Sequence, residues 1–279
     1  MTPIVSVKPV ALPAPGRGQD LHVRVTAPLT GHDLPVLLFS HGFGSSLDGY
    51  GPLADHWAGQ GFVVLQPTYL DSRTVGLAPE DPRTPNIWRF RIDDAKRTLD
   101  HLGTLEAAVP GLAGRVDHDH IVAAGHSFGG QTTGALLGLR VFGEDFRNPR
   151  VRKGVLLATA GRGGDDLTPY ATEHFPYLNP DFGHMTAPAL VVAGDKDQNF
   201  LTTRGPDWMA DPYLLAPGPK TLLTLYGAEH SLGGIPGYEA RETTDEDPSR
   251  LALLQRLTTA YLRGEDLPDP GGLGRLETK

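Results

Sequence analysis

The chain has 279 residues, a formal net charge of −8 and no cysteine. Its length suffices to bury one large core, and the absence of cysteine excludes disulfides, thiolate metal sites and a cysteine nucleophile. The negative charge comes without a block of basic residues, so neither nucleic acid nor an anionic membrane surface is an expected partner. No stretch approaches the roughly 18 consecutive apolar residues that indicate a membrane span.

The two ends of the chain carry little regular pattern. The first sixteen residues include four prolines and lack the basic start and apolar run of a signal peptide, so we expect a cytoplasmic protein. Residues 266–279 include two prolines and three glycines, which predicts a loose tail. We therefore expect a single domain over residues 1–265, and nothing in the sequence indicates a particular oligomeric state.

Between these ends, short apolar runs alternate with helical patterns, which is typical of a mostly parallel sheet flanked by helices. Residues 21–26 alternate apolar with polar side chains, as an antiparallel edge strand does. Buried strands are predicted at 35–40, 62–66, 120–125, 154–158, 189–194 and 221–226. Helices are predicted at 49–59, at 87–105, after Ser127 and at 248–263, where Pro248 suits the start and Gly264 the end. These elements predict an α/β fold with a central sheet of about seven or eight strands.

Long connections rich in glycine and proline follow three of the predicted strands, at 67–86, 161–188 and 198–219. Loops at strand ends usually carry the binding surface. Tyr69, Trp88 and Trp208 lie in or beside these loops, so we expect them to line a pocket; the alternative is that they pack inside the protein.

The sequence Gly-His-Ser-Phe-Gly at 125–129 follows a predicted strand and precedes a helical pattern. In this context it is typical of a nucleophile elbow, a sharp turn that exposes the serine hydroxyl at the end of the sheet. Glycines at its two ends are needed where neighbouring backbone approaches closely. We therefore predict Ser127 as a nucleophile; the alternative is a helix-capping serine in a glycine-rich turn.

A serine nucleophile needs a base, because an unactivated hydroxyl reacts poorly at neutral pH. If the chain order is serine, acid, histidine, the base must follow the acid. His230 is the only histidine beyond Asp197, and it lies in a loop after the last buried strand. We therefore predict His230 as the base.

The acid is predicted from the sequence Gly-Asp-Lys-Asp at 194–197. An aspartate next to a glycine is suited to holding a turn, so Asp195 is expected to support the loop and Asp197 to face the site. Asp195 is the first alternative as the acid, and Asp165 or Asp166, after the preceding strand, are the others. The acid holds the histidine tautomer and stabilises the cation that forms.

An oxyanion hole is predicted from Ser-His-Gly-Phe-Gly at 40–44, directly after a strand. The amide of Phe43 is expected to join that of Phe128, because this architecture takes one donor from each of these places. An ordinary tight turn is the alternative. His41 is expected to brace the loop by hydrogen bonding, since proton transfer is assigned to His230.

Two other clusters of charged residues are expected to have no catalytic role. The run Asp-His-Asp-His at 117–120 lies at the end of its strand opposite to Ser127, so we predict neither a metal site nor any cofactor. Arg91 is expected to form a structural ion pair with Asp94 or Asp93 in the same helix.

Taken together, His-Gly at 41–42, the elbow at 125–129, Gly-Asp-Lys-Asp at 194–197 and the His230 loop resemble the α/β-hydrolase superfamily. The runs at 35–44, 61–64 and 125–133 are similar to the branch that contains platelet-activating-factor acetylhydrolases, chlorophyllases, cutinase-like polyesterases and dienelactone-hydrolase-related esterases. This resemblance implies metal-free hydrolysis of carboxylic esters, with Asp197 as the acid and the amides of Phe43 and Phe128 as the oxyanion hole.

The sequence thus predicts a serine esterase acting on a small-molecule ester. The alternatives on the same triad are cleavage of C–C bonds, amides, thioesters or lactones, or cofactor-free peroxidation. A non-enzymatic alternative is a small-molecule receptor on the same fold.

Overall fold

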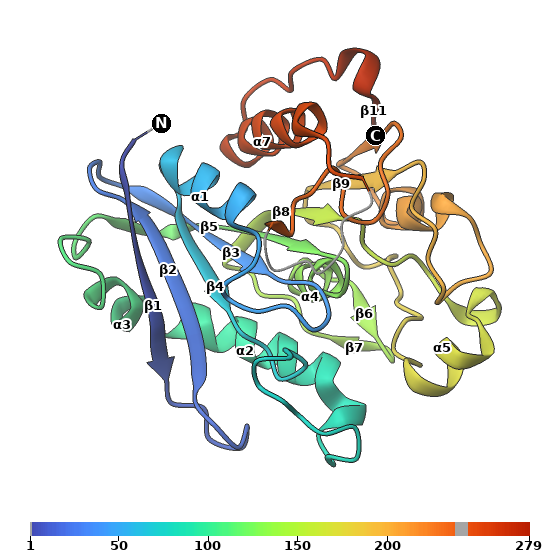
Figure 1. Ribbon diagram of the computed structural model, residues 1–279, viewed down its shortest axis with the longest axis horizontal. Helices are drawn as coiled ribbons and strands as arrows, with labels where there is room; N and C mark the ends of the chain where they lie inside the picture. The colour runs from blue at the N-terminus through green and yellow to red at the C-terminus, as the bar shows by residue number, and fades with distance from the viewer. Residues whose placement is uncertain (1, 238–244) are drawn as a thin grey trace.

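The computed structural model describes residues 2–237 and 245–279, and within them nine strands form one central sheet (Figure 1). In order across the sheet the strands are β1 (Ile4–Leu12), β2 (Leu21–Pro28), β4 (Val63–Pro67), β3 (Leu34–Ser40), β5 (Val116–His126), β8 (Val151–Leu157), β9 (Ala189–Gly194), β10 (Lys220–Leu225) and β11 (Gly274–Thr278). The six strands from β4 to β10 run parallel, while β1, β2 and β11 pair antiparallel. The predicted α/β class and mostly parallel sheet are confirmed.

The central strands are parallel because helices connect them across both faces. Strands β4 and β9 are buried along their whole length. The sequence of β9 is apolar throughout, and that of β4 is apolar except for Gln66, as expected for central strands of a parallel sheet. Strand β2 is antiparallel as predicted, but it is not an edge, because β1 pairs with its outer side.

The sheet has two edge strands that the sequence did not predict. In β1 the pairing register shifts between Val7 and Val10, where Pro9 has no amide to donate, and the prolines concealed the strand pattern. The prediction of a loose tail at 266–279 is wrong. Its two prolines and the glycines at 271 and 272 lie before the strand, in the segment that includes the 3₁₀ turn Gly271–Leu273. Strand β11 then begins at Gly274 and pairs with β10. The sheet therefore continues to Thr278.

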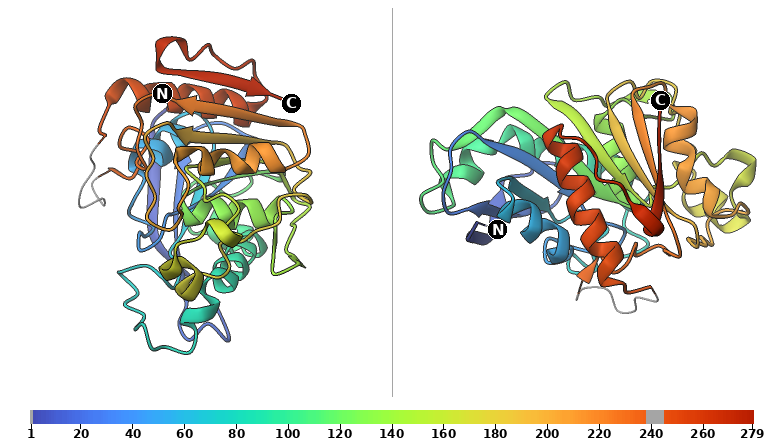
Figure 2. Two further views of the ribbon diagram at one scale, coloured as in Figure 1. Left: turned by 90° about the vertical axis from the view of Figure 1, so that its right-hand side faces the viewer. Right: turned by 90° about the horizontal axis from the view of Figure 1, so that it is seen from above.

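The helices form a layer on each face of the sheet (Figure 2). Helices α1 (Gly51–Gly59) and α7 (Pro248–Arg263) pack on one face with Leu37 and Phe39 of β3, whereas Val36 and Leu38 belong to the core on the other face. That second layer contains α2 (Ile87–Asp100), α3 (Leu102–Ala107), α4 (Phe128–Leu136) and α6 (Asp211–Leu215). Helix α7 begins and ends as predicted, and no helix in the described part of the chain is long and apolar enough to cross a bilayer.

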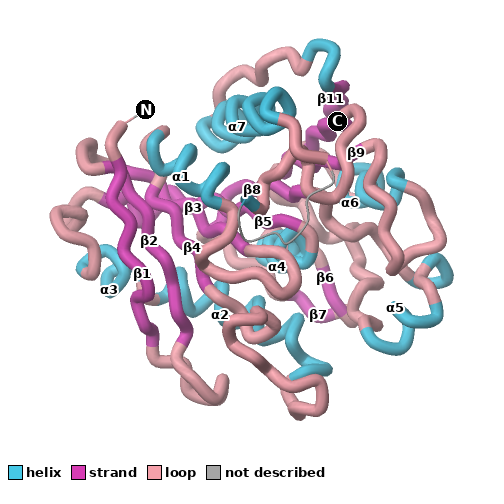
Figure 3. The backbone as a smooth tube through the Cα atoms, in the orientation of Figure 1, coloured by secondary structure: helices cyan, strands magenta, loops and turns pink. Residues whose placement is uncertain are grey.

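The smaller elements lie in the loops, which Figure 3 shows as the pink segments around α4, α5 and α6. They are the hairpin of β6 (Arg140–Val141) and β7 (Glu144–Asp145), the helix α5 (Pro169–His174), and the 3₁₀ turns Thr84–Asn86, Gly164–Asp166 and Pro206–Ala210. The predicted long connections contain all of these elements except the hairpin, so they are largely ordered.

Helix α4 is buried at every residue, which is unusual for a helix of an α/β protein. Its small residues allow the close approach: a Cβ added at Gly130 would lie 1.7 Å from Thr159 Oγ1. The loop between β8 and β9 covers its outer side, where Gln131 Nε2 donates to the Tyr177 carbonyl at 2.9 Å. The residue that precedes this helix, Ser127, is thereby held in a rigid setting.

Candidate active site

Ser127 occupies a sharp turn between β5, which ends at His126, and α4, which begins at Phe128. Its φ of 54° and ψ of −121° are disfavoured for a residue with a side chain, and such strain persists only where the surroundings enforce it. A Cβ atom added at Gly125 would lie 2.1 Å from the Gly129 carbonyl oxygen, and one added at Gly129 would lie 1.9 Å from the Ser40 carbonyl oxygen. The strand–turn–helix context predicted for the serine is therefore present.

Three side chains from separate loops form a chain of hydrogen bonds at the carboxyl ends of β5, β9 and β10. His230 Nε2 lies 2.9 Å from Ser127 Oγ, and His230 Nδ1 lies 2.8 Å from Asp197 Oδ2. Because a carboxylate only accepts, Nδ1 carries the proton, and Nε2 is left to accept from the serine hydroxyl. The Asp197 side chain is fully buried, whereas that of His230 is 39% exposed. The structure thus brings together the three residues predicted as nucleophile, acid and base.

The alternative acids lie elsewhere. The Asp195 carboxylate accepts the Gly227 amide at 2.6 Å and so holds the turn after β10, as its place beside a glycine predicts. Asp165 and Asp166 belong to a 3₁₀ turn bordering a separate surface hollow. Of the four carboxylates considered from the sequence, the structure places Asp197 beside the His230 ring.

A buried pair, Tyr50 and His126, links the loop of His230 to the loop after β3. His126 Nε2 lies 2.8 Å from the His230 carbonyl oxygen, and His126 Nδ1 lies 2.8 Å from Tyr50 Oη. The Tyr50 oxygen in turn accepts the Gly42 amide at 3.0 Å. One assignment satisfies every group: Nε2 donates to the carbonyl, and Tyr50 donates to Nδ1. Sequence reasoning missed this pair, because the contacting residues are far apart in the chain.

The imidazole of His126 is held neutral by its surroundings. Burial, and then the neighbouring His230, lower its pKa from 6.5 to about 3. His41 is similar: burial and then the charge of Arg91 lower its pKa to about 3. His41 Nδ1 donates to the Gly42 carbonyl at 2.6 Å, and Nε2 accepts the Tyr69 amide at 3.1 Å, so His41 braces the loop as expected.

These two neutral imidazoles make the folded protein sensitive to acid. Their pKa values are about 3 in the folded state and 6.5 ordinarily, so between these pH values the unfolded chain binds more protons. The free energy of unfolding therefore falls as the pH decreases from 6.5 towards 3. In denaturant titrations between pH 7 and pH 4, we expect a smaller fall for His126→Gln, whose amide donates without titrating. An equal fall in the wild type and this variant would show that His126 is not kept neutral.

A buried ion pair shapes the loop after β3. Arg91 binds both oxygens of Asp71, at 2.8 and 2.7 Å, and also donates to the carbonyls of His41 and Gly42 at 2.8 and 3.2 Å. Asp71 accepts the Gly44 amide at 3.1 Å. Burial alone raises the pKa of Asp71, but the Arg91 guanidinium outweighs burial and holds this pKa below its ordinary value. The pair therefore fixes the direction of the peptide groups on both sides of Phe43.

The expectation that Arg91 forms an ion pair with Asp94 or Asp93 is wrong. Asp94 pairs instead with Arg17, at 2.8 Å, and both of these side chains are buried. A buried charge needs several partners to offset its desolvation, and a neighbour on the same helix cannot supply them. Arg91 obtains them from Asp71, from two carbonyls, and from the Tyr69 and Phe128 rings, whose centroids lie 4.5 and 4.3 Å from its guanidinium carbon.

Phe43 and Phe128, whose amides are predicted to form the oxyanion hole, both line the cavity above Ser127. Their ring centroids lie 6.4 Å apart, and Phe128 is the first residue of α4. The amides on either side of Phe43, those of Gly42 and Gly44, are bound to Tyr50 and Asp71. This arrangement orders the backbone in which the Phe43 amide lies.

The cavity has a volume of about 720 Å³ and opens beside Ser127 and His230. Tyr69, Trp88 and Trp208 were expected to line it, but they are buried elsewhere. Tyr69 Oη lies 2.7 Å from Ser40 Oγ, Trp88 packs edge-on against Phe142 and Phe146, and Trp208 donates to the Arg162 carbonyl at 2.8 Å. Such large side chains contribute most when fully covered, so they anchor the loops from beneath. The cavity is instead lined by Phe43, Phe128, Tyr170, Phe175, Tyr177 and Phe200.

Asp245 anchors the His230 loop and was also missed. Its carboxylate accepts the amides of Glu229, at 2.7 Å, and Gly233, at 3.1 Å, and the Ser231 hydroxyl. These contacts bracket His230 on both sides. Asp245 is one of several acidic residues in this part of the sequence, and nothing in the sequence distinguishes it as the residue that holds the His230 loop.

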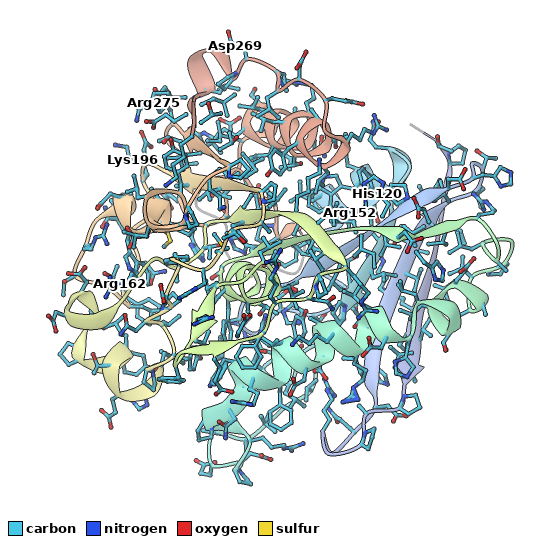
Figure 4. All side chains as sticks on the ribbon, turned by 180° about the vertical axis from the view of Figure 1, so that it is seen from behind. His120, Arg152, Arg162, Lys196, Asp269 and Arg275 are labelled. Atoms are coloured by element: carbon cyan, nitrogen blue, oxygen red, sulfur yellow. The ribbon has the colours of Figure 1, made fainter. Side chains whose placement is uncertain are left out.

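No group of three or more histidine or acidic side chains within residues 2–237 and 245–279 is arranged to hold a metal ion. The run at 117–120 lies in the first part of β5, where His120 is labelled in Figure 4. Six residues of β5 separate His120 from Ser127, so the two residues lie about 23 Å apart along the extended chain. His118 instead contacts Glu106, at 2.7 Å.

Comparison with known proteins identifies the fold. Neither a family model nor a curated protein sequence matches the chain. Among solved structures, it is similar to an esterase of Pyrobaculum calidifontis in a monoclinic crystal form, with 20% sequence identity and a TM-score of 0.63 over 94% of this chain and 85% of the esterase. The chain has an α/β-hydrolase fold. Ser127, Asp197 and His230 lie in the loops that follow β5, β9 and β10 of this fold, and their side chains are joined by hydrogen bonds.

Proposed function

We propose that the protein is a serine hydrolase that cleaves carboxylic esters through an acyl-enzyme. The observation that carries this proposal is the hydrogen-bonded chain from Ser127 through His230 to the buried Asp197. A serine hydroxyl becomes an effective nucleophile when an adjacent base accepts its proton. The resemblance to a solved esterase supports the same chemistry through its fold.

In the first half-reaction, His230 Nε2 accepts the proton of Ser127 Oγ as the oxygen attacks the ester carbonyl carbon. Asp197 keeps the proton on Nδ1 and stabilises the imidazolium. The amides of Phe43 and Phe128 donate to the oxyanion of the tetrahedral intermediate. When the intermediate collapses, the C–O bond to the alcohol breaks and His230 returns the proton to the leaving oxygen.

In the second half-reaction, water replaces the alcohol. His230 accepts a proton from this water as its oxygen attacks the acyl carbon, and the same two amides hold the new oxyanion. Collapse breaks the bond to Ser127 Oγ, which regains its proton from His230. The carboxylic acid leaves and the enzyme returns to its starting state, with no cofactor in the cycle.

The surroundings of the serine favour a neutral substrate. Among the described residues that line the cavity there is no aspartate or glutamate and one arginine, Arg73, while most of the lining is apolar or aromatic. We therefore assign a small, uncharged ester as the substrate. Hydrolysis of 4-nitrophenyl esters of increasing acyl length, compared with the matching anilides and thioesters, tests the assignment. Turnover of esters supports it, whereas turnover confined to another acyl class contradicts it.

The Tyr50 hydroxyl is expected to position the catalytic loops. In Tyr50→Phe, the Gly42 amide and His126 Nδ1 both lose the hydrogen bond to the Tyr50 hydroxyl. The loop after β3 is then no longer connected through His126 to the His230 loop. A misplacement of about 1 Å at an active site can cost about 100-fold in rate. We expect kcat for a 4-nitrophenyl ester to fall by about 10- to 100-fold, with a smaller change in KM.

The melting temperature of Tyr50→Phe, and its rate of labelling by a serine-directed fluorophosphonate, provide the controls. Slower labelling by a variant that remains folded supports positioning. An unchanged kcat would show that the bridge through His126 has no part in catalysis.

A further inference from the structure

Six aromatic side chains that line the cavity form one connected group of ring contacts. This group, the aromatic wall, consists of Phe43, Phe128, Tyr170, Phe175, Tyr177 and Phe200. They come from separate parts of the chain: the loop after β3, the first turn of α4, helix α5 with the residues after it, and the loop after β9. The wall is therefore a product of the tertiary fold.

The rings of the wall contact one another in sequence from Ser127 outwards. Phe128 stacks on Tyr177, with centroids 5.3 Å apart and planes 15° apart. Phe43 lies 6.4 Å from Phe128 and 6.3 Å from Phe175. Further out, Tyr170 lies 5.8 Å from Phe175 and 6.3 Å from Phe200. A chain of ring contacts thus leads from Phe128, the residue after Ser127, to the exposed Phe200.

The rings of Phe43, Tyr170 and Phe200 are exposed, whereas aromatic rings that pack inside a protein are buried. Phe128 is 8% exposed, but Phe43 is 56%, Tyr170 51% and Phe200 74% exposed. Clustered exposed apolar side chains beside a cavity usually mark a binding surface. Because the inner end of the wall is the residue after Ser127, its occupant is the molecule that Ser127 attacks.

The chemistry of the wall indicates which part of that molecule it binds. Aromatic rings favour other aromatic rings as neighbours, because offset-stacked and edge-on pairs are more stable than their buried area alone accounts for. The described lining contains no carboxylate, and its one guanidinium, Arg73, is not part of the wall. A planar, aromatic and uncharged group fits these features of the wall.

We propose that the aromatic wall is a binding subsite for an uncharged aryl group of the ester substrate, joined through a short linker to the carbonyl that Ser127 attacks. This inference rests on the proposed ester hydrolysis and adds the substrate class to it. The wall selects aryl esters over esters that carry a saturated ring of the same size.

Matched ester pairs test the selection. Ethyl 3-phenylpropanoate and ethyl 3-cyclohexylpropanoate differ only in the aromaticity of the acyl ring, and benzyl acetate with cyclohexylmethyl acetate makes the same comparison on the alcohol side. We expect kcat/KM to favour the phenyl ester by about 5- to 20-fold in at least one pair, as stacking of one or two rings predicts. Equal kcat/KM within both pairs overturns the proposal.

Variants locate the selection on the wall. In Tyr170→Ala/Phe200→Ala the preference is expected to fall at least threefold, mainly through KM; both side chains are exposed, so folding does not depend on them. Phe142→Ala is the matched control, because Phe142 is 60% exposed and packs on Trp88 outside the cavity. If the control lowers the preference as much as the double variant, the wall is not the source.

Binding of a ketone separates this proposal from the proposed hydrolysis. Calorimetry compares the affinity of the protein for 4-phenylbutan-2-one with its affinity for 4-cyclohexylbutan-2-one. Neither ketone has an ester bond to break. If no ester is hydrolysed but the phenyl ketone binds more tightly, and Tyr170→Ala/Phe200→Ala removes the difference, hydrolysis fails and the subsite stands. If both ketones bind equally while esters are hydrolysed, hydrolysis stands and the subsite fails. A further outcome also overturns the proposal. If the double variant no longer binds phosphatidylcholine vesicles but keeps its preference for phenyl esters, the exposed rings bind lipid and not the aryl group of the substrate.

Discussion

Replacing His230 with alanine is expected to lower kcat for a 4-nitrophenyl ester by about 100,000-fold. The imidazole is the only base within hydrogen-bond distance of Ser127 Oγ among the described residues, and without it the hydroxyl keeps its proton. Losses of this size are typical when the base of a serine triad is removed. The remaining rate comes from the oxyanion donors and substrate binding alone. Stopped-flow and long-incubation assays together cover this range.

The stability of His230→Ala provides the control for that loss. The His230 side chain is partly exposed, and its carbonyl oxygen, which His126 binds, is retained in the variant. We therefore expect a melting temperature close to that of the wild type. A folded His230→Ala that keeps more than about one hundredth of the wild-type kcat contradicts the assignment of the base.

Replacing Asp197 with asparagine is expected to lower kcat by about 1,000- to 10,000-fold. An amide in place of the buried carboxylate can donate to His230 Nδ1, which then must accept, so the proton moves to Nε2. In that tautomer His230 cannot take the Ser127 proton. The shape of the side chain is preserved, so the effect is on tautomer and charge.

Asp195→Asn is the matched comparison for this variant. Its carboxylate holds the Gly227 amide and an amide oxygen accepts the same hydrogen bond, so we expect a change in kcat below about tenfold. The two aspartates differ by two positions in one loop. If Asp195→Asn caused the larger loss, the assignment of the acid would be reversed.

The sequence predicted those parts of the structure that depend on local pattern. The parallel strands are recognisable because each is a short apolar run, and Ser127 because its flanking glycines are required at a strained turn. His230 followed from chain order alone. The edge strands β1 and β11 were missed, because prolines and glycines interrupt or precede strands that are covered on one side only.

The sequence did not predict the parts of the site that depend on long-range contacts. Tyr50 and His126 are 76 residues apart, and His126 and His230 are 104 apart, so no local pattern connects them. Arg91 takes its partner from a loop 20 residues away. The aromatic residues of the loops also have two different roles. Some, such as Trp208, are buried and anchor a loop, whereas others, such as Phe200, line the cavity. Which role a residue has depends on how the folded chain packs, so the sequence does not show it.

These long-range contacts have a common effect on the proposed mechanism. Arg91 and Asp71 order the loop after β3, which contains Phe43. Asp245 holds the loop of His230. Tyr50 and His126 connect these two loops. Groups fixed before the substrate arrives need not reorganise as charge develops, which is the main source of electrostatic catalysis. The serine, the histidine and the amides proposed as oxyanion donors are therefore held by different parts of one connected framework.

Labelling with a fluorophosphonate tests directly whether Ser127 is an activated nucleophile, because this reagent forms a stable bond only with an activated serine. We expect one adduct per chain, located by mass spectrometry on the peptide that contains Ser127, and no adduct in a folded Ser127→Ala variant. A folded wild-type protein that is not labelled, or one labelled at another serine, would contradict the assignment of Ser127 as the nucleophile.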